Sequence, residues 1–421
     1  MARKMKSSGI EWIGEIPEGW SIARGKHILT LLQRAVFPTD GVITCFRDGE
    51  VTLRSNRRED GFTVSLKEIG YQGIEPGDLV VHGMDGFAGS IGISDSRGKS
   101  SPVLVVLDSS QDKKYLMYYL RSMAYNNVFL ALSTGIRVRS CDLKWNKLAD
   151  LLYLVPPIVE QHKLVSFLDE KCSEIDAMLS KTRASIEEYK KLKQAVITQA
   201  VTKGVRGERE MKDSGVEWIG EIPKEWVCEK IKYATSISRG LFNHRPRNDE
   251  RYYNGKYPFI QTGDVANATK YIVSYSQTLN ELGKSVSKEF PKGTLTMTIA
   301  ANVGDVAILN FDAYFPDSVV GFIPNKNIRT LYLFYVFSAM KDEFTRTAIK
   351  STQLNLNIDR VKETFIPVTL DSNEQCEIEN YLESKCAEID GLIAKKEQLV
   401  KELESYKKSL IYEVVTGKRK V

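Results

Sequence analysis

Apolar residues recur at alternating spacings of four and three in two stretches of the chain, residues 168–200 and 382–414. A 3.5-residue period kept over more than four heptads predicts a long helix with a narrow seam, which buries best against a second helix of the same kind. The polar residues that interrupt each apolar seam also occupy matching positions: Thr182 corresponds to Lys396, and Lys193 corresponds to Lys407. The first seam consists of Leu168, Cys172, Ile175, Leu179, Thr182, Ile186, Tyr189, Lys193, Val196 and Ala200, and adding 214 to each number gives the second.

These two helices have two possible arrangements. The shared interruptions favour pairing of the two seams within the molecule as an antiparallel coiled coil, since a buried polar position can fix the register. Two amphipathic helices, each docked on its own domain, are the alternative. Pro156-Pro157 precedes the first helix, and Ser372 to Gln375 has capping-box spacing for the second. Gly204 and Gly417 suit the two helix ends.

The regions before the two helices have strand-like patterns followed by a helical one, which predicts a mixed α/β domain in each. In the first region the expected strands are 42–46, 78–83, 91–94 and 103–107, and the expected helix is 113–132. In the second region the expected strands are 257–265, 293–300, 305–311 and 319–323, and the expected helix is 330–349.

A second repeat opens each half of the chain. Residues 5–20 read MKSSGIEWIGEIPEGW and residues 211–226 read MKDSGVEWIGEIPKEW, with 12 of 16 positions identical. We expect Trp12, Pro17 and Trp20, with their counterparts, to fasten this tag to the domain or to the coil. The chain is therefore predicted to be a tandem duplication of tag, domain and long helix. The predicted segments are domain 1 at 1–157, spacer helix 1 at 158–204, domain 2 at 205–371 and spacer helix 2 at 372–421.

The fold class that follows is α/β: two mixed α/β domains in tandem, joined by two long helices that form an antiparallel coiled coil with pseudo-twofold symmetry. The 421 residues exceed one ordinary core, and 42% hydrophobic with 27% charged residues is typical of a folded protein. No apolar run reaches the length of a membrane span, and the start lacks the apolar segment of a secretory signal. The six cysteines show no CxxC spacing, so a reduced, cytoplasmic protein is expected.

The sequence contains no catalytic constellation. It has no Walker A motif and no glycine-rich strand-to-helix turn for a dinucleotide or adenosylmethionine. The glycines of 86–92 are expected in a hairpin, and the four histidines lack metal-ligand spacing. A binding protein is therefore favoured over an enzyme, and no metal site is expected. The net charge of +5 permits nucleic-acid binding without arguing for it.

Two segments of each half carry the Arg, Lys, Asn and Gln residues that read DNA. Residues 45–58 are matched with 259–270, which sets Arg47 opposite Gln261, and residues 133–140 are matched with 351–358. Ordinary solvated loops remain the alternative for any single residue. The candidate DNA-binding residues are Arg47, Arg54, Arg57, Arg58, Arg137, Arg139, Arg245, Gln261, Lys270, Gln353, Asn355 and Asn357.

The doubled SGxEWIGEIPxxW tag, the EQxxIxxYLxxKCxEID helix start and the closing IxxxVVTGK resemble the specificity subunits of type I DNA restriction-modification systems. The resemblance covers essentially the whole chain. It implies a non-catalytic DNA-binding subunit whose two target-recognition domains each bind one half of a bipartite site. It also implies that the paired helices dock two modification (methyltransferase) subunits, and that restriction subunits join the larger complex. S-adenosylmethionine, ATP and Mg²⁺ would belong to those partners, with no cofactor in this chain.

A duplicated coiled-coil scaffold that binds other proteins rather than DNA is the rival hypothesis. Arginine fits the two major-groove acceptors of guanine, whereas Asn and Gln fit the donor–acceptor pair of adenine. The first domain offers Arg47, Arg137 and Arg139 where the second offers Gln261, Asn355 and Asn357. We therefore expect a half-site rich in G·C pairs for the first domain and an adenine-led half-site for the second.

Overall fold

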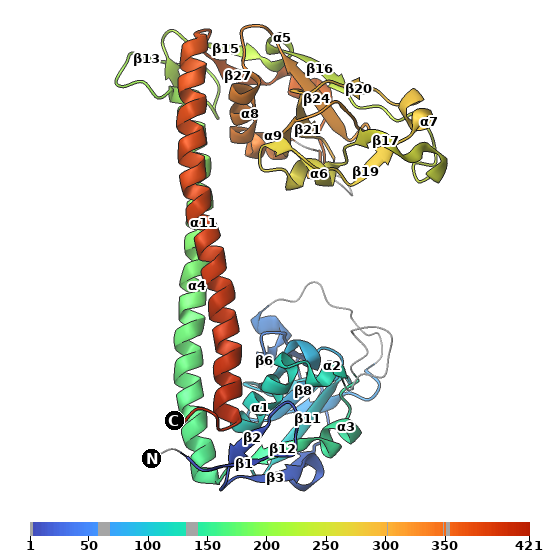
Figure 1. The fold of residues 1–421 in the computed structure, drawn as a ribbon, viewed down its shortest axis with the longest axis vertical. Coiled ribbons are helices and arrows are strands. Elements are labelled where there is room, and N and C mark those ends of the chain that lie inside the picture. Colours follow the sequence, from blue (N-terminus) through green and yellow to red (C-terminus); the bar gives the residue numbers. More distant parts are fainter. Residues whose placement is uncertain (1–2, 58–67, 132–141, 301, 348, 351–353) are drawn as a thin grey trace. The chain divides into compact units, whose positions relative to one another are not determined.

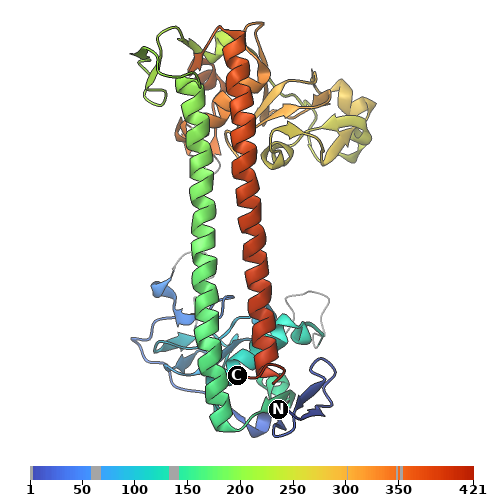
Figure 2. The same ribbon diagram turned by 60° about the vertical axis from the view of Figure 1, so that its left-hand side comes forward.

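The computed structural model describes all residues except 1–2, 58–67, 132–141, 301, 348 and 351–353. The chain divides into two compact units, each containing one domain and part of both long helices (Figures 1 and 2). The first half comprises residues 1–183 and 397–421, and the second half comprises residues 184–396. The long helices are α4 (Ile158–Lys203) and α11 (Ser372–Val415). Helix α4 therefore begins directly after Pro156-Pro157.

The domain of the first half is built on a four-stranded antiparallel sheet, which α1 (Lys113–Tyr125) covers on one side. The sheet order is β4 (Leu29–Leu31), β11 (Leu104–Ser109), β8 (Leu79–His82) and β9 (Ile91–Ile93). Two-stranded pairs surround it: β1 (Met5–Ser7) with β2 (Glu15–Pro17), β3 (Ser21–Arg24) with β12 (Leu152–Val155), β5 (Ile43–Cys45) with β6 (Val51–Leu53), and β7 (Gln72–Ile74) with β10 (Gly98–Ser100). The short helices are α2 (Val128–Ala131) and α3 (Trp145–Asp150).

The domain of the second half has two larger sheets. The first has the order β16 (Thr235–Arg239), β24 (Val319–Pro324), β21 (Leu295–Thr298), β22 (Val306–Leu309) and β18 (Tyr271–Ile272). The second has the order β19 (Gln277–Leu279), β17 (Tyr253–Phe259), β23 (Ala313–Tyr314) and β20 (Glu289–Phe290). The pairs are β13 (Met211–Asp213) with β14 (Glu221–Pro223), β15 (Val227–Lys230) with β27 (Phe365–Val368), and β25 (Ile349–Lys350) with β26 (Leu354–Asn355). The shorter helices are α5 (Ile231–Ala234), α6 (Thr262–Asn267), α7 (Glu281–Ser285), α8 (Thr330–Ala339), α9 (Lys341–Thr347) and α10 (Ile358–Glu363).

The long helices pack along the predicted seams. In the first half, Leu168, Ile175 and Leu179 of α4 are buried in the same core as Leu410 and Val414 of α11. Contacts between early α4 and late α11 mean that the two segments run antiparallel. The same holds in the second half for late α4 and early α11. The mixed α/β class with two tandem domains and long central helices is thus confirmed.

Four local predictions were wrong, and three of them have an identifiable reason. The helix expected at 113–132 breaks after Tyr125, where Asn127 takes a left-handed φ of 58°. The helix expected at 330–349 breaks at Met340 between α8 and α9. The strand expected at 257–265 ends at Phe259, because Gln261 and Asp264 form a capping box that starts α6. The cap of α11 is the side chain of Asp371, which accepts from the Asn373 amide at 2.9 Å, rather than Ser372.

Candidate nucleic-acid interface

Each opening tag is fastened to the start of a long helix by a tryptophan. The Trp20 indole donates to Glu160 of α4 at 3.0 Å, and the Trp226 indole donates to Glu374 of α11 at 2.9 Å. Both rings are fully buried, and an arginine lies over each one, Arg3 or Arg209. The packing role predicted for these tryptophans is therefore confirmed. The repeated tag and the repeated helix start are two parts of one clasp.

The glutamine that follows each of these glutamates holds the domain. Gln161 accepts from the Asp112 amide at 3.0 Å and donates to the Pro156 carbonyl at 2.8 Å. Gln375 accepts from the Arg329 amide at 2.8 Å and donates to the Thr369 carbonyl at 2.8 Å. Asp112 and Arg329 directly precede α1 and α8, so the same contact docks the equivalent helix of each domain.

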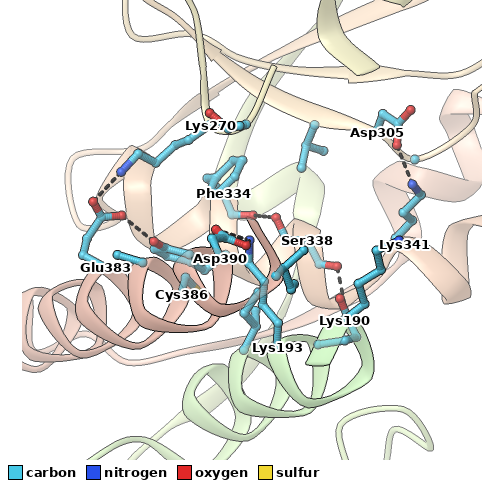
Figure 3. A pocket seen from close by; sticks show the side chains of 18 residues that line it. Lys190, Lys193, Lys270, Asp305, Phe334, Ser338, Lys341, Glu383, Cys386 and Asp390 are labelled. Carbon is cyan, nitrogen blue, oxygen red and sulfur yellow. Dashed lines mark hydrogen bonds and ion pairs between the residues drawn. The ribbon is translucent and has the colours of Figure 1, made fainter. Parts of the chain in front are cut away.

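A third equivalent contact joins these domain helices to the long helices. The Tyr118 hydroxyl donates to Asp169 at 2.8 Å, and the Tyr335 hydroxyl donates to Glu383. Lys270 also pairs with Glu383 (Figure 3). Burial pushes the pKa of Glu383 upward, but the hydrogen bonds from Lys270 and Tyr335 outweigh burial, so this pKa lies below the usual glutamate value. Domains of different sequence are therefore held on the helices in the same way.

The coil itself repeats an ion pair across the two helices. Lys407 lies 2.7 Å from Asp176 in the first half, and Lys193 lies 2.7 Å from Asp390 in the second. These lysines are the polar interruptions of the seam. Each buries its aliphatic stem in the seam while its ammonium reaches a carboxylate on the other helix. The interruptions thus favour one register.

In the first domain, the β5–β6 hairpin presents three of the candidate arginines. Arg57 lies over the Phe46 ring at 4.2 Å and pairs with Asp48 and Glu50, so it stabilises the hairpin tip. Arg54 donates to Thr44 at 3.3 Å. The Arg47 side chain is 58% exposed and forms an ion pair of 3.2 Å with Asp85. Arg47 is therefore the hairpin cation best placed to meet a ligand.

Arg121 of α1 positions this hairpin. Its Nη2 donates to the Gly49 carbonyl at 2.9 Å, and its Nε donates to the Ile91 carbonyl at 2.7 Å. Gly49 has a φ of 89°, and a Cβ atom there would lie 1.8 Å from the guanidinium. The glycine is therefore required both by the turn and by the close approach of Arg121. Sequence reasoning missed this role, because nothing near Arg121 in the sequence points to the hairpin.

The segment matched to this hairpin in the second domain has a different structure. Residues 45–57 belong to the β5–β6 hairpin and the turn after it, whereas residues 259–270 leave a strand and form α6. Gln261 caps α6, and its side chain donates to Gln277 at 2.9 Å. Lys270 lies against α11 in its ion pair with Glu383. Arg47 and Gln261 are therefore not structural counterparts, and that part of the sequence interpretation was wrong.

Three arginines of the second domain lie at the end of β16 and in the loop that follows it, residues 239–247. Arg245 is largely exposed, and it donates to the carbonyls of Phe242 and His244 at 2.8 and 2.9 Å. Arg247 pairs with Asp317, and Arg239 donates to the carbonyl of Asp317 at 2.6 Å. Arg239 and Arg247 were not among the DNA-binding candidates predicted from the sequence, although they stand in an arginine-rich run, RGLFNHRPR at 239–247.

The remaining candidates lie in the segments that precede the long helices. Asn357 is exposed and caps α10 by accepting from the Asp359 amide at 2.8 Å. Asn355 lies on β26. Arg58, Arg137, Arg139 and Gln353 lie outside the described residues. The structure therefore brings Arg47, Arg54 and Arg57 together on one hairpin, and it places Arg245, Gln261, Lys270 and Asn357 on separate elements.

Among the described residues, no group of three or more His, Cys, Asp and Glu side chains is placed to hold a metal ion. No helix in the same part of the chain is both long and apolar enough to cross a membrane.

Two different α/β domains, held by the same clasps on paired long helices, define a duplicated recognition protein. The model of the type I restriction modification DNA specificity domain matches residues 237–402. The putative type I restriction enzyme MjaX specificity subunit of Methanocaldococcus jannaschii is 23% identical over 434 residues, covering 97% of this chain and 96% of that protein. The EcoKI specificity subunit of Escherichia coli is 22% identical over 254 residues, covering 54% of this chain and 51% of that protein.

A solved chain from a study of complex assembly and conformational transition in the type I restriction-modification system shares the fold. It superposes with a TM-score of 0.74 at 14% identity, covering 96% of this chain and 99% of that one. Residues 237–402 thus match the type I DNA specificity domain, and nearly the whole chain is similar to a type I restriction enzyme specificity subunit.

Proposed function

We propose that this chain is the non-catalytic subunit that reads a bipartite DNA target, with one domain on each half-site. One observation carries the proposal: equivalent clasps hold two domains whose exposed cationic loops differ. The β5–β6 hairpin presents Arg47 in the first domain, and the loop before β17 presents Arg245 in the second. The clasps on the long helices are equivalent in the two halves, whereas the exposed loops of the two domains differ. This arrangement is suited to reading two different DNA sequences.

The contacts of the candidate residues sort them by role. Arg47 and Arg245 are exposed on loops and suit base edges or phosphates. Arg57 supports the hairpin, and Lys270 packs the second domain on α11, so neither is assigned to DNA. The different base preferences of the two halves stay a prediction, since Arg137 and Arg139 lie outside the described residues.

We assign partner docking to one flank of the coil. In the first half Met178 and Tyr406 are exposed there, and in the second half Leu192 and Leu392. Each of these residues directly precedes a seam position, and Met178 corresponds to Leu392 as Leu192 does to Tyr406. The opposite flank carries charges such as Asp176 and Asp390. An apolar flank repeated in both halves suits two copies of one partner, the modification subunit.

The rest of the assembly follows from this assignment. Restriction subunits would join the complex of this chain with two modification subunits. S-adenosylmethionine, ATP and Mg²⁺ would be bound by those partners and not by this chain. We place the protein in the cytoplasm, which fits the unpaired state of Cys45, Cys172, Cys228, Cys376 and Cys386.

The test replaces Arg47 with Gln in the assembled methyltransferase and maps the methylated sites. A base contact relaxes one position of one half-site, by roughly 1–3 kcal/mol of discrimination. A phosphate contact weakens methylation evenly and lowers its salt dependence. Arg183→Gln is the matched control, because Arg183 is also 58% exposed with a carboxylate partner but lies on the coil. Full methylation of an unchanged site by the Arg47→Gln variant would contradict the assignment.

A further inference from the structure

Arg47 of the β5–β6 hairpin is held by a carboxylate from a different loop of the first domain. Asp85 lies in the loop 83–90, which joins β8 to β9, and its Oδ1 accepts from Nη2 of Arg47 at 3.2 Å. The Asp85 side chain is 28% exposed, about half as much as that of Arg47. The carboxylate therefore sits deeper than the guanidinium that it contacts.

The loop that carries Asp85 is fixed by its own contacts. Nδ1 of His82 accepts from the amides of Met84 and Asp85 at 3.2 and 3.0 Å. Burial lowers the pKa of His82, so this nitrogen keeps its lone pair for the two amides near neutral pH. The Asp85 carbonyl accepts from the Ala88 amide at 2.9 Å, which closes the turn. The place of the Asp85 carboxylate is thus set by its loop and not by Arg47.

The hairpin that carries Arg47 is anchored separately. Arg121 donates to the Gly49 carbonyl at its tip, and the Val51 carbonyl of β6 accepts from the Asp95 amide at 3.1 Å. Two independently anchored loops therefore bring one cation and one carboxylate together. Because both backbones are held, the ion pair acts mainly on the direction of the Arg47 side chain.

The loop at the equivalent place in the second domain is different. Strands β21 and β22 stand in their sheet where β8 and β9 stand in the sheet of the first domain. The residues that join them, 299–305, read IAANVGD. Their one charged residue, Asp305, pairs with Lys341 of α9. An exposed arginine held by a carboxylate of this loop is therefore a feature of the first domain.

We propose that Asp85 is the positioning residue that directs Arg47 to the major-groove edge of a guanine in the first half-site. A carboxylate 3.2 Å from the guanidinium repels a phosphate, whereas the O6 and N7 acceptors of guanine carry no net charge. The ion pair also orients the planar guanidinium, as a bidentate contact to guanine requires. The inference rests on the proposed function, and it assigns Arg47 to base reading instead of phosphate binding.

The test replaces Asp85 with Asn in the assembled methyltransferase. Methylation rates are compared on duplexes that carry each of the four base pairs at every position of the first half-site. We expect the preference for guanine at one position to fall about tenfold, within the discrimination that a bidentate pair supplies. Arg47→Gln should relax the same position, and adding Asp85→Asn to it should relax that position no further.

Two further variants separate position from charge. Asp85→Glu keeps the charge but moves the carboxylate by one methylene, so it should also relax the preference, to a smaller extent. Asp48→Asn is the matched control: it removes the same charge from the hairpin tip, but its partner Arg57 keeps Glu50 at 3.0 Å. It should leave every base preference unchanged. A preference is a ratio of rates, so a lower folded fraction alone does not alter it.

The outcomes distinguish this inference from the proposed function. Relaxation by Arg47→Gln but not by Asp85→Asn would overturn the positioning role and leave the proposed function standing. An even loss across all duplexes in both variants would make Arg47 a phosphate contact and would also overturn the inference. Equal relaxation by Asp48→Asn would show a general effect of charge and overturn it too. An unaltered complex without any base preference would overturn both.

Discussion

Replacing Glu374 with Gln is expected to destabilise the second half much more than Glu160→Gln destabilises the first. The Glu374 side chain is 1% exposed and lies 2.6 Å from Arg209, 2.9 Å from the Trp226 indole and 3.0 Å from the Thr369 hydroxyl. An amide loses the charge and turns an NH₂ group toward one of these donors. Removing one partner of a buried ion pair costs about 3–5 kcal/mol, and we expect the lower end because Arg209 keeps Glu225 at 2.8 Å.

The same substitution at Glu160 acts on a more solvated group. Its side chain is 26% exposed, and it accepts from Trp20 and Arg3. Water compensates part of the loss, so the cost should be about 1 kcal/mol. At about 2–4 °C per kcal/mol for units of this size, the midpoints should fall by about 6–12 °C for Glu374→Gln and about 2–4 °C for Glu160→Gln.

Differential scanning calorimetry of the full chain measures both effects under one condition. Thr369→Val removes the hydroxyl donor at almost the same side-chain volume, and it should cost less than Glu374→Gln because the carboxylate keeps Arg209 and the Trp226 indole. Equal shifts for the two glutamate variants would refute the reasoning, since burial would then not decide how much each clasp stabilises its half.

Other predictions concern the coil and its pH response. Leu179→Asp places a carboxylate at a buried seam position and should cost about 4 kcal/mol, whereas Ile393→Asp at a half-buried position should cost about half as much by chemical denaturation. Equal costs would show that the seam is uniformly buried. Because the folded pKa of Glu383 lies below its usual value, its stabilising contribution is present above the unfolded pKa of about 4.3 and is lost as pH falls through the folded pKa. Glu383→Gln should therefore make the free energy of unfolding depend less steeply on pH in that window. An unchanged pH dependence would show that Glu383 does not contribute to it.

The frame was predictable from the sequence because its causes are periodic and duplicated. The seam spacing predicted the long helices, and the repeated interruptions at Lys193 and Lys407 proved to be repeated ion pairs. The repeated tag predicted buried tryptophans. Its partner, the glutamate of the helix start, lies 140 residues away from Trp20 and 148 residues away from Trp226, a pairing that no local pattern indicates.

The recognition surfaces were less predictable, because they depend on tertiary contacts. The capping box of Gln261 and Asp264 converts an apparent strand into α6, so a match between segments 45–58 and 259–270 fails despite their shared glycine. Arg121 reaches Gly49 from 72 residues away and holds the hairpin through backbone carbonyls.

The central claim is that each domain reads its own half-site on a shared frame. The most direct measurement is the methylated sequence produced by a chain in which residues 20–157 also replace residues 226–371, with the modification subunit unchanged. The equivalent clasps of Glu160 and Glu374 should seat the transplanted domain. We predict methylation at a site made of two copies of the first half-site, with the second half-site no longer required. Continued methylation of the original bipartite sequence would contradict the account.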